Sequence, residues 1–312
     1  MRRTQGRELA AIAASAAALG ALSAAPTAAA EGGARFDPPD RVPAGSGGTR
    51  FGQRVRKPVR RPALRFFHLR PASLFLYGRP ARARFRIDSR AHRVRVTLLV
   101  RRRGGRVLRR IRLGRFRTRR AHHVRFHVRS LPEGRYVVGI RARDGRGRPL
   151  RRARLARGRG HVRASRGFGV HGHRFPLRGS FSLGGSGARF GDDRGDHRHN
   201  GQDLAAAAGT PVVAPRGGRI EHVGYQASGA GHYIVLDGGG EDRDYVFMHL
   251  RAGSTRVRRG QRVVTGERLG DVGNTGRSFG AHLHFEIWVG GWYSGGQAID
   301  PLPALRRWNR WS

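Results

Sequence analysis

The sequence predicts a mainly β protein, in which a small β-sandwich precedes a C-terminal domain built on an antiparallel β-sheet. Three observations predict this fold class. Between residues 63 and 153, short runs alternate apolar residues with arginine, at the period of two that half-buried strands require. From residue 174 to residue 305, short strand-like runs are bounded by glycine. That second region also lacks a long helical period, which favours strands over helices.

The first 62 residues are expected to lie outside both domains. Three arginines within the first seven residues precede an Ala/Leu-rich run, and three alanines follow at residues 28–30. This order predicts a secretory signal peptide at residues 1–30, and hence a secreted or cell-envelope protein that meets a membrane only during export. An uncleaved membrane anchor is the alternative, although the run is short for a span. Residues 31–62 are rich in Gly, Pro and Arg and predict a disordered linker.

The β-sandwich is predicted for residues 63–153. Its strands are expected at residues 83–87, 94–100, 107–113, 124–128 and 136–142. Turn signals such as Gly104-Gly105 and Asp144-Gly145 separate these runs, which favours a small antiparallel sandwich. The stretch LPEGRYVVGIRARDGRGRPL, at residues 131–150, resembles the end of an immunoglobulin-like module of bacterial surface proteins.

A second linker is predicted at residues 154–173, where glycine and arginine return without apolar periodicity. The C-terminal domain is then expected over residues 174–305, with a frayed tail at residues 306–312. Its strands are expected at residues 211–214, 233–236, 245–248 and 283–289.

Composition restricts the partners and the chemistry. The chain has 63 Lys plus Arg against 20 Asp plus Glu, which favours anionic partners. Anionic cell-wall polymers fit this charge, whereas nucleic acid is disfavoured because no motif of a known reader is present. An arginine-biased genome is the simplest alternative explanation. The absence of cysteine excludes disulfides, thiolate ligands and a cysteine nucleophile, so any metal must be held by histidines and carboxylates.

Three clusters that are distant in the sequence contain residue types that bind metals. His199 and Asp203 are four residues apart in HNGQD, a spacing that places both side chains on one side of a strand or of a helix. His249 lies near the end of DYVFMHL. His282 and His284 are two apart in HLHFEI, and on the expected strand they share one face at a separation of about 7 Å.

Each cluster alone is a weak signal, because the chain contains 15 histidines and even spacings arise by chance. His171 and His173 have the same spacing of two and are interpreted as a feature of the second linker. The histidines that lack a carboxylate or a second ligand at a useful spacing are interpreted as surface or satisfied core residues.

The order and surroundings of the three clusters are more specific. They lie in RFGDDRGDHRHNGQDLAAAAGTPVVAPRGGRI (189–220), VFMHL (246–250) and GERLGDVGNTGRSFGAHLHFEI (266–287). In this order the segments resemble the landmarks of the lysostaphin and LytM-like peptidoglycan endopeptidases, a family of murein hydrolase metallopeptidases with the duplicated hybrid motif fold. The resemblance covers roughly residues 175–305.

The resemblance implies one Zn²⁺ per catalytic domain. His199, Asp203 and His284 would be its ligands, with His249 and His282 facing the catalytic water and the scissile carbonyl. Two neutral imidazoles and one carboxylate leave a fourth position for water, whose pKa zinc lowers to about 7. The two other histidines can exchange protons near neutral pH, and the sequence does not distinguish their roles.

The sequence departs from the family pattern at two positions. Phe247 replaces a usual tyrosine and Ala281 replaces a common proline. Neither is an expected ligand, so we expect activity to survive. Glu286 shares the strand face of His282 and His284 and is interpreted as a solvated charge rather than as a partner of a ligand.

The sequence therefore predicts a zinc-dependent endopeptidase that cleaves peptidoglycan stem peptides or cross-bridges. A non-catalytic, wall-binding regulator of other hydrolases is the first alternative, and the presence of all five site residues argues against it. The second alternative is an arginine-rich nucleic-acid-binding protein, which rests on net charge alone and conflicts with export.

Overall fold

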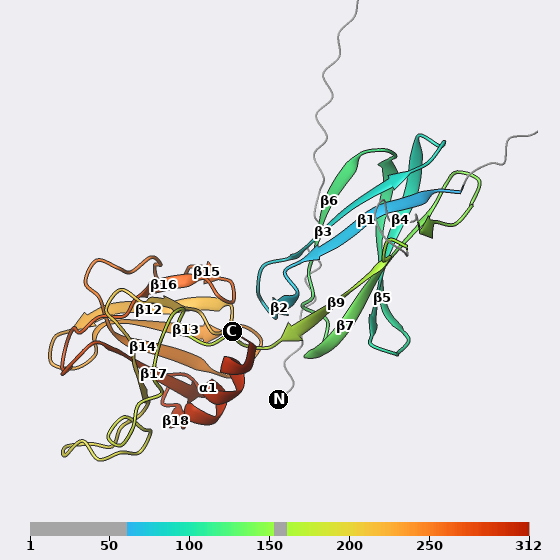
Figure 1. The fold of residues 1–312 in the computed structure, drawn as a ribbon. Coiled ribbons are helices and arrows are strands. Elements are labelled where there is room, and N and C mark those ends of the chain that lie inside the picture. Colours follow the sequence, from blue (N-terminus) through green and yellow to red (C-terminus); the bar gives the residue numbers. More distant parts are fainter. Residues whose placement is uncertain (1–60, 153–160, 312) are drawn as a thin grey trace, which may run out of the picture. The chain divides into compact units, whose positions relative to one another are not determined.

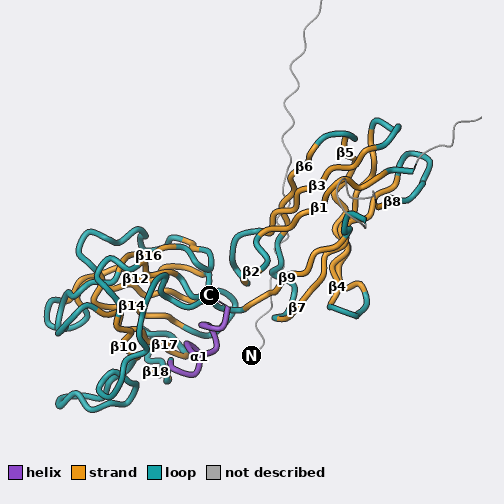
Figure 2. Tube along the Cα trace, in the orientation of Figure 1, coloured by secondary structure: helices purple, strands orange, loops and turns teal. Residues whose placement is uncertain are grey.

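The computed structural model describes residues 61–152 and 161–311 (Figure 1). The expected signal peptide, residues 31–60 of the first expected linker and residues 153–160 lie outside the described residues. The described chain is mainly β, as predicted, and its helical segments lie at the C-terminal end (Figure 2). No helix in this part of the chain has the length and apolar character needed to cross a membrane.

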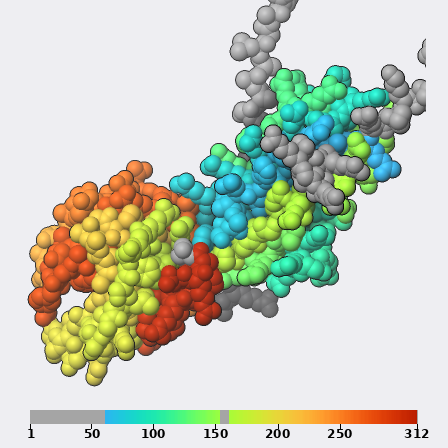
Figure 3. Space-filling model, in the orientation of Figure 1, coloured from blue at the N-terminus to red at the C-terminus, as the bar shows by residue number. Residues whose placement is uncertain are grey.

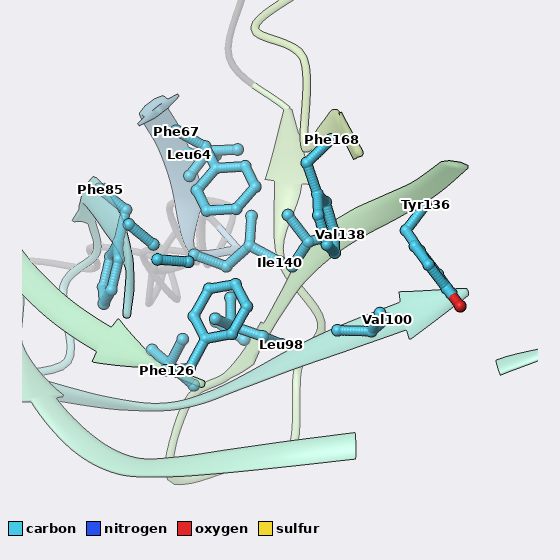
Figure 4. Close-up of a cluster of buried hydrophobic side chains, with 14 of the residues drawn as sticks. Leu64, Phe67, Phe85, Leu98, Val100, Phe126, Tyr136, Val138, Ile140 and Phe168 are labelled. Atoms are coloured by element: carbon cyan, nitrogen blue, oxygen red, sulfur yellow. The ribbon is translucent and has the colours of Figure 1, made fainter. Parts of the chain in front are cut away.

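Two sheets form the first β region, called the sandwich (residues 63–152 and 161–171). One has the strand order β6–β3–β1–β8 and the other the order β2–β9–β7–β4–β5. The strands are β1 (Ala63–Arg70), β2 (Ser73–Phe75), β3 (Ala81–Asp88), β4 (Arg93–Arg102), β5 (Val107–Arg117), β6 (Ala121–Phe126), β7 (Gly134–Arg143), β8 (Arg151–Arg152) and β9 (Ser165–His171). Inward side chains from both sheets, among them Phe67 and Val138, pack into one hydrophobic core (Figure 4). The likeness to an immunoglobulin module stays a prediction.

Strict alternation explains how an arginine-rich sequence builds this core. In β3 the residues at 81, 83, 85 and 87 are buried, whereas the arginines between them are exposed. Strand β9 differs from the prediction, because residues 165–171 were expected in a linker. Phe168 and Val170 of β9 are buried, but Gly167 and Gly169 flank them and weaken the apolar signal of the strand.

The second β region has its own hydrophobic core around a larger antiparallel sheet of order β10–β17–β14–β13–β12–β15, with β18 paired to β17. Strands β11 and β16 form a separate pair. The elements are β10 (Gln202–Ala205), β11 (Pro211–Val213), β12 (Gly218–Gln226), β13 (Gly231–Gly238), β14 (Asp244–Leu250), β15 (Arg262–Val263), β16 (Arg268–Asp271), β17 (His282–Val289), β18 (Gln297–Ile299), α1 (Leu302–Trp308) and the 3₁₀ helix η1 (Asn309–Trp311).

The C-terminal residues 306–311 do not form the expected frayed tail. They complete α1 and η1, and the atoms of this C-terminal segment are drawn in red in Figure 3. Trp308 is 1% exposed in the core, and Trp311 Nε1 donates a hydrogen bond to the His173 carbonyl. His173 is also buried and its ring stacks on Trp308. Aromatic burial therefore orders a segment too short to show a helical period.

Candidate metal centre

Three potential ligand atoms converge at the edge of the larger sheet. Antiparallel pairing of β10 with β17 sets Asp203 directly opposite His284. Asp203 Oδ1 lies 3.1 Å from His199 Nε2 and 2.9 Å from His284 Nδ1. The two histidine nitrogens are 2.9 Å apart. These residues therefore form a group that can hold a metal ion.

Hydrogen bonds on the far side of each imidazole determine which nitrogen faces this centre. His199 Nδ1 donates to the Arg189 carbonyl at 2.7 Å, and a carbonyl can only accept, so His199 Nε2 keeps its lone pair. His284 Nε2 lies 2.9 Å from Glu286 Oε1, which leaves His284 Nδ1 for the centre. With neutral imidazoles, three electron-pair donors face one another, and a cation bound between them would stabilise that arrangement.

The spacing of the donors also fits a metal. Ligand atoms held tetrahedrally at about 2.0–2.1 Å from zinc lie roughly 3.3 Å from one another. The separations of 2.9–3.1 Å among the three donors are close to this value. A small outward shift of the side chains would therefore accommodate the ion.

The electrostatics of the centre favour positive charge. Before a metal binds, protons on the facing nitrogens replace it. Burial opposes the ionisation of Asp203, but hydrogen bonds from the protonated His199 and His284 then hold the pKa of its carboxyl well below the usual range. Burial also disfavours the charged form of His284, yet hydrogen bonds with Asp203 and Glu286 raise its pKa to about 9. A metal that binds here displaces the proton that His284 otherwise holds.

His249 and His282 lie beside the three donors, with ring centroids 4.8 Å apart. His249 Nδ1 donates to the Thr275 carbonyl and His282 Nδ1 to the Gly280 carbonyl, each at 2.8 Å. The Nε2 atom of each ring is therefore its basic nitrogen. His282 Nε2 lies 3.7 Å from Asp203 Oδ1. Burial lowers the pKa of His249 to about 4, which keeps this imidazole neutral at neutral pH.

An open groove of about 570 Å³ gives access to all five side chains. Phe279, which is 95% exposed, lines it together with Met248. Arg277 Nη1 and Asp196 Oδ2 form an ion pair of 3.0 Å between two loops that line the same groove. The five side chains therefore line a groove that is open to solvent, together with this ion pair and the exposed ring of Phe279.

Residues 197–301 match the model of Peptidase family M23, and this segment contains all five side chains. The chain carries an M23 domain. We use this name for residues 173–311, which enclose the hydrophobic core that extends from Phe175 to Trp308.

Three curated relatives show the extent of the similarity. The chain is 42% identical over 104 residues to a protein named "Uncharacterized metalloprotease" from Haemophilus influenzae, which covers 33% of this chain and 20% of the relative. It is 39% identical over 93 residues to peptidoglycan DD-endopeptidase ShyA from Vibrio cholerae, a match that covers 30% of this chain and 21% of ShyA. It is 36% identical over 109 residues to lysostaphin from Staphylococcus simulans, a match that covers 35% of this chain and 21% of lysostaphin. The chain thus spans about a fifth of the length of these relatives.

Glu286 of the M23 domain is not the solvated charge that the sequence interpretation assumed. It is 4% exposed, and its second oxygen accepts a hydrogen bond of 2.7 Å from Trp288 Nε1. Its first oxygen holds His284 Nε2, so the carboxylate orients this candidate ligand from behind. The sequence contained an indication of this contact. His284, Glu286 and Trp288 occupy alternate positions of one strand, so their side chains lie on the same face.

Arg194 is a site residue that sequence reasoning missed. Its Nη2 lies 2.6 Å from Asp203 Oδ2, the oxygen that does not face the centre. Arg194 thereby fixes Asp203 so that Oδ1 alone points at the two imidazoles. It lies in a loop nine residues before Asp203, where no periodicity indicates the contact.

Proposed function

We propose that the M23 domain is a zinc-dependent endopeptidase that hydrolyses peptide bonds in the stem peptides or cross-bridges of peptidoglycan. One observation carries the proposal: three electron-pair donors meet at a point beside two imidazoles whose basic nitrogens are available, at the floor of an open groove. The name of the relative ShyA, a peptidoglycan DD-endopeptidase, supports the choice of substrate. The location that follows is the cell envelope or the extracellular space.

Zinc is the metal that this donor set favours. Two neutral imidazoles and one carboxylate, with a further position left for water or substrate, are the composition of hydrolytic zinc sites. His199, Asp203 and His284 would hold the ion. When bound, zinc lowers the pKa of a coordinated water to about 7 and polarises the substrate carbonyl.

The side chains around the metal site have two further functions, which are to orient the ligands and to transfer protons. Glu286 and Arg194 hold two of the ligands in orientation, since each hydrogen-bonds the side of the ligand that is turned away from the centre. The basic nitrogens of His249 and His282 can accept a proton from the attacking water and return one to the leaving amine. Their Nδ1–H groups stay on backbone carbonyls throughout, which keeps both rings in place.

The test uses the full chain and purified cell-wall sacs. Zinc-loaded protein should release new amino termini, which amine labelling and mass spectrometry of the fragments would detect and assign to a bond. A chelator should abolish the release and added zinc should restore it. A His222→Ala variant is the matched control, because His222 stacks on Tyr233 on the same sheet and lies outside the centre.

Two outcomes would contradict the proposal. If the protein contains no stoichiometric zinc and releases no termini, the centre is not a hydrolytic site. If the protein binds one zinc but releases no termini, while it stimulates a separate wall hydrolase, the wall-binding regulator is the better account.

A further inference from the structure

The positive charge of the chain is concentrated in the sandwich. The sandwich, residues 63–152 and 161–171, contains 31 arginines and three acidic residues, whereas residues 173–311 contain 18 arginines and 13 acidic residues. An arginine-biased genome acts on both regions alike, so it explains arginine in each but not the near absence of acidic residues from one. The imbalance is therefore a property of the sandwich itself.

Within the sandwich, exposed arginines gather on the outer surface of the five-stranded sheet. Alternation along β4 buries Val94 and Val96 and turns Arg93 and Arg95 outward. We call the following eight exposed residues the arginine face: Arg93 and Arg95 of β4, Arg110, Arg112, Arg115 and Arg117 of β5, and Arg141 and Arg143 of β7. Three adjacent strands thus contribute to one charged surface.

The register of the strands places like charges side by side. Arg95 lies directly opposite Arg115 on one side and Arg143 on the other. Arg93 lies opposite Arg117. Like charges in directly opposite positions of an antiparallel pair are destabilising.

Carboxylates do not relieve this repulsion. Among the described residues, no member of the arginine face forms an ion pair, and the acidic residues of the sandwich that do so pair elsewhere. Asp144, next in sequence to Arg143, is buried and bound by Arg148. Arg95, Arg110 and Arg141 line a shallow hollow of about 200 Å³ on this surface. The repulsion between these arginines is therefore not relieved within the sandwich. An external anion that binds to this surface would relieve it.

We propose that the arginine face binds a linear, phosphodiester-linked polymer of the cell wall and so holds the chain beside its substrate. The choice of a wall polymer rests on the function proposed for the M23 domain. Guanidinium groups bind phosphates with two parallel hydrogen bonds. Arginines on neighbouring strands are about 4.8 Å apart and those two positions apart on one strand about 7 Å apart, so a flexible polyanion meets several of them at once.

The composition of the face also separates this partner from single-stranded nucleic acid. Outward positions of β4, β5 and β7 carry no aromatic side chain, the group on which proteins stack unpaired bases. The face therefore offers charge without base recognition, which matches a polymer of phosphates and simple polyols.

The experiment measures binding of the full chain to fluorescent poly(glycerol phosphate), free of lipid, between 50 and 200 mM salt. An Arg95→Gln, Arg112→Gln, Arg141→Gln variant should bind at least about tenfold more weakly, and its salt slope should fall by about one for each arginine that contacts a phosphate. The control variant Arg82→Gln, Arg84→Gln, Arg125→Gln removes the same charge from the other sheet. Neutral polyglycerol tests whether the phosphates are required.

Equal losses in both triple variants would overturn the proposal, because net charge rather than this face would then set the affinity. Undiminished binding to neutral polyglycerol would overturn it as well, and that result does not depend on any variant. Duplex DNA that displaces the polymer at a lower phosphate concentration would assign the face to nucleic acid. Hydrolysis of a short soluble peptide substrate, measured in parallel, should be unchanged in both variants, so failure of the binding proposal is distinguished from failure of the catalytic one.

Discussion

The sandwich and the M23 domain are both antiparallel β structures with apolar cores, but they place charge in opposite ways. The sandwich turns its arginines outward, where like charges lie opposite one another. The M23 domain buries Asp203, Glu286 and Glu241 in part or in full, each with hydrogen-bonding partners. Buried charge is costly unless paired, and exposed like charge is costly unless neutralised from outside. The buried carboxylates of Asp203 and Glu286 belong to the candidate metal centre, whereas the exposed arginines of the sandwich indicate a binding surface.

The largest expected effect concerns proton transfer in the M23 domain. His249→Ala or His282→Ala should lower kcat for wall-peptide hydrolysis by about 100- to 10,000-fold, because each removes a group that can move protons. Zinc content should stay at one per chain, since neither residue is in the donor set. Metal analysis and single-substrate kinetics check this. Equal kcat in the variant and the wild type would exclude that histidine from the chemistry.

A smaller effect, on zinc affinity, is expected from Glu286, which hydrogen-bonds His284 on the side turned away from the centre. Glu286→Gln should weaken zinc binding by about 10- to 100-fold, because an amide cannot accept hydrogen bonds from both His284 and Trp288. Competition with a chromogenic chelator measures this affinity without any substrate. Trp288→Phe is the matched control and should cost less, since the carboxylate still holds His284. A larger loss in Trp288→Phe than in Glu286→Gln would contradict the assigned role.

The buried ion cluster around Glu241 should affect stability rather than activity. Burial raises the pKa of Glu241, but a hydrogen bond with His173 and further contacts with Tyr245 and Arg216 lower it by more. The ionised carboxylate therefore stabilises the fold above its ordinary pKa of 4.5, and this contribution disappears as the pH falls through the lowered value.

Glu241→Gln should consequently destabilise the protein by about 1.5–3 kcal/mol at pH 7. The difference from wild type should shrink as the pH falls below 4.5. Urea unfolding at several pH values measures both. Asp242→Asn changes an exposed neighbouring carboxylate and should cost less than about 0.5 kcal/mol. A pH-independent difference for Glu241→Gln would show that packing, not charge, explains its effect.

The smallest expected effect has the opposite sign and lies in the sandwich. Arg95→Glu replaces two like-charge neighbours by two opposite-charge pairs, so it should stabilise the sandwich by about 0.2–1 kcal/mol at low salt. The gain should decrease as salt screens the charges. Thermal unfolding at two salt concentrations measures it, with Arg258→Glu in the M23 domain as the control. Destabilisation by Arg95→Glu would mean that the arginine face is not under repulsion.

The sequence predicts those strands and site residues that have a clear local pattern of residue types. The alternation of β3 and β4 is visible in the sequence because each strand buries one face. The five site residues lie in ordered motifs, and the structure brings their side chains together. The failures come from tertiary context. Strand β9 has glycines where alternation would be visible, and Trp308 orders a C-terminal segment only because a core exists to receive it.

Residues that support the site are harder to predict than those that form it. Arg194 reaches Asp203 from a loop, so only the folded chain reveals the contact. Glu286 has the right spacing, but spacing alone does not tell a buried carboxylate from a solvated one. Its role follows from its burial and from the hydrogen bonds that it accepts from His284 and Trp288. Neither can be read from a single sequence.

Zinc titration of the metal-free full chain measures directly whether His199, Asp203 and His284 hold one metal ion. One zinc per chain should bind tightly in the wild type and in His222→Ala. It should bind at least about 100-fold more weakly in His284→Ala, since loss of a ligand should exceed the loss of an outer partner. Full zinc occupancy in His284→Ala, or none in the wild type, would contradict the claim that His199, Asp203 and His284 hold one metal ion.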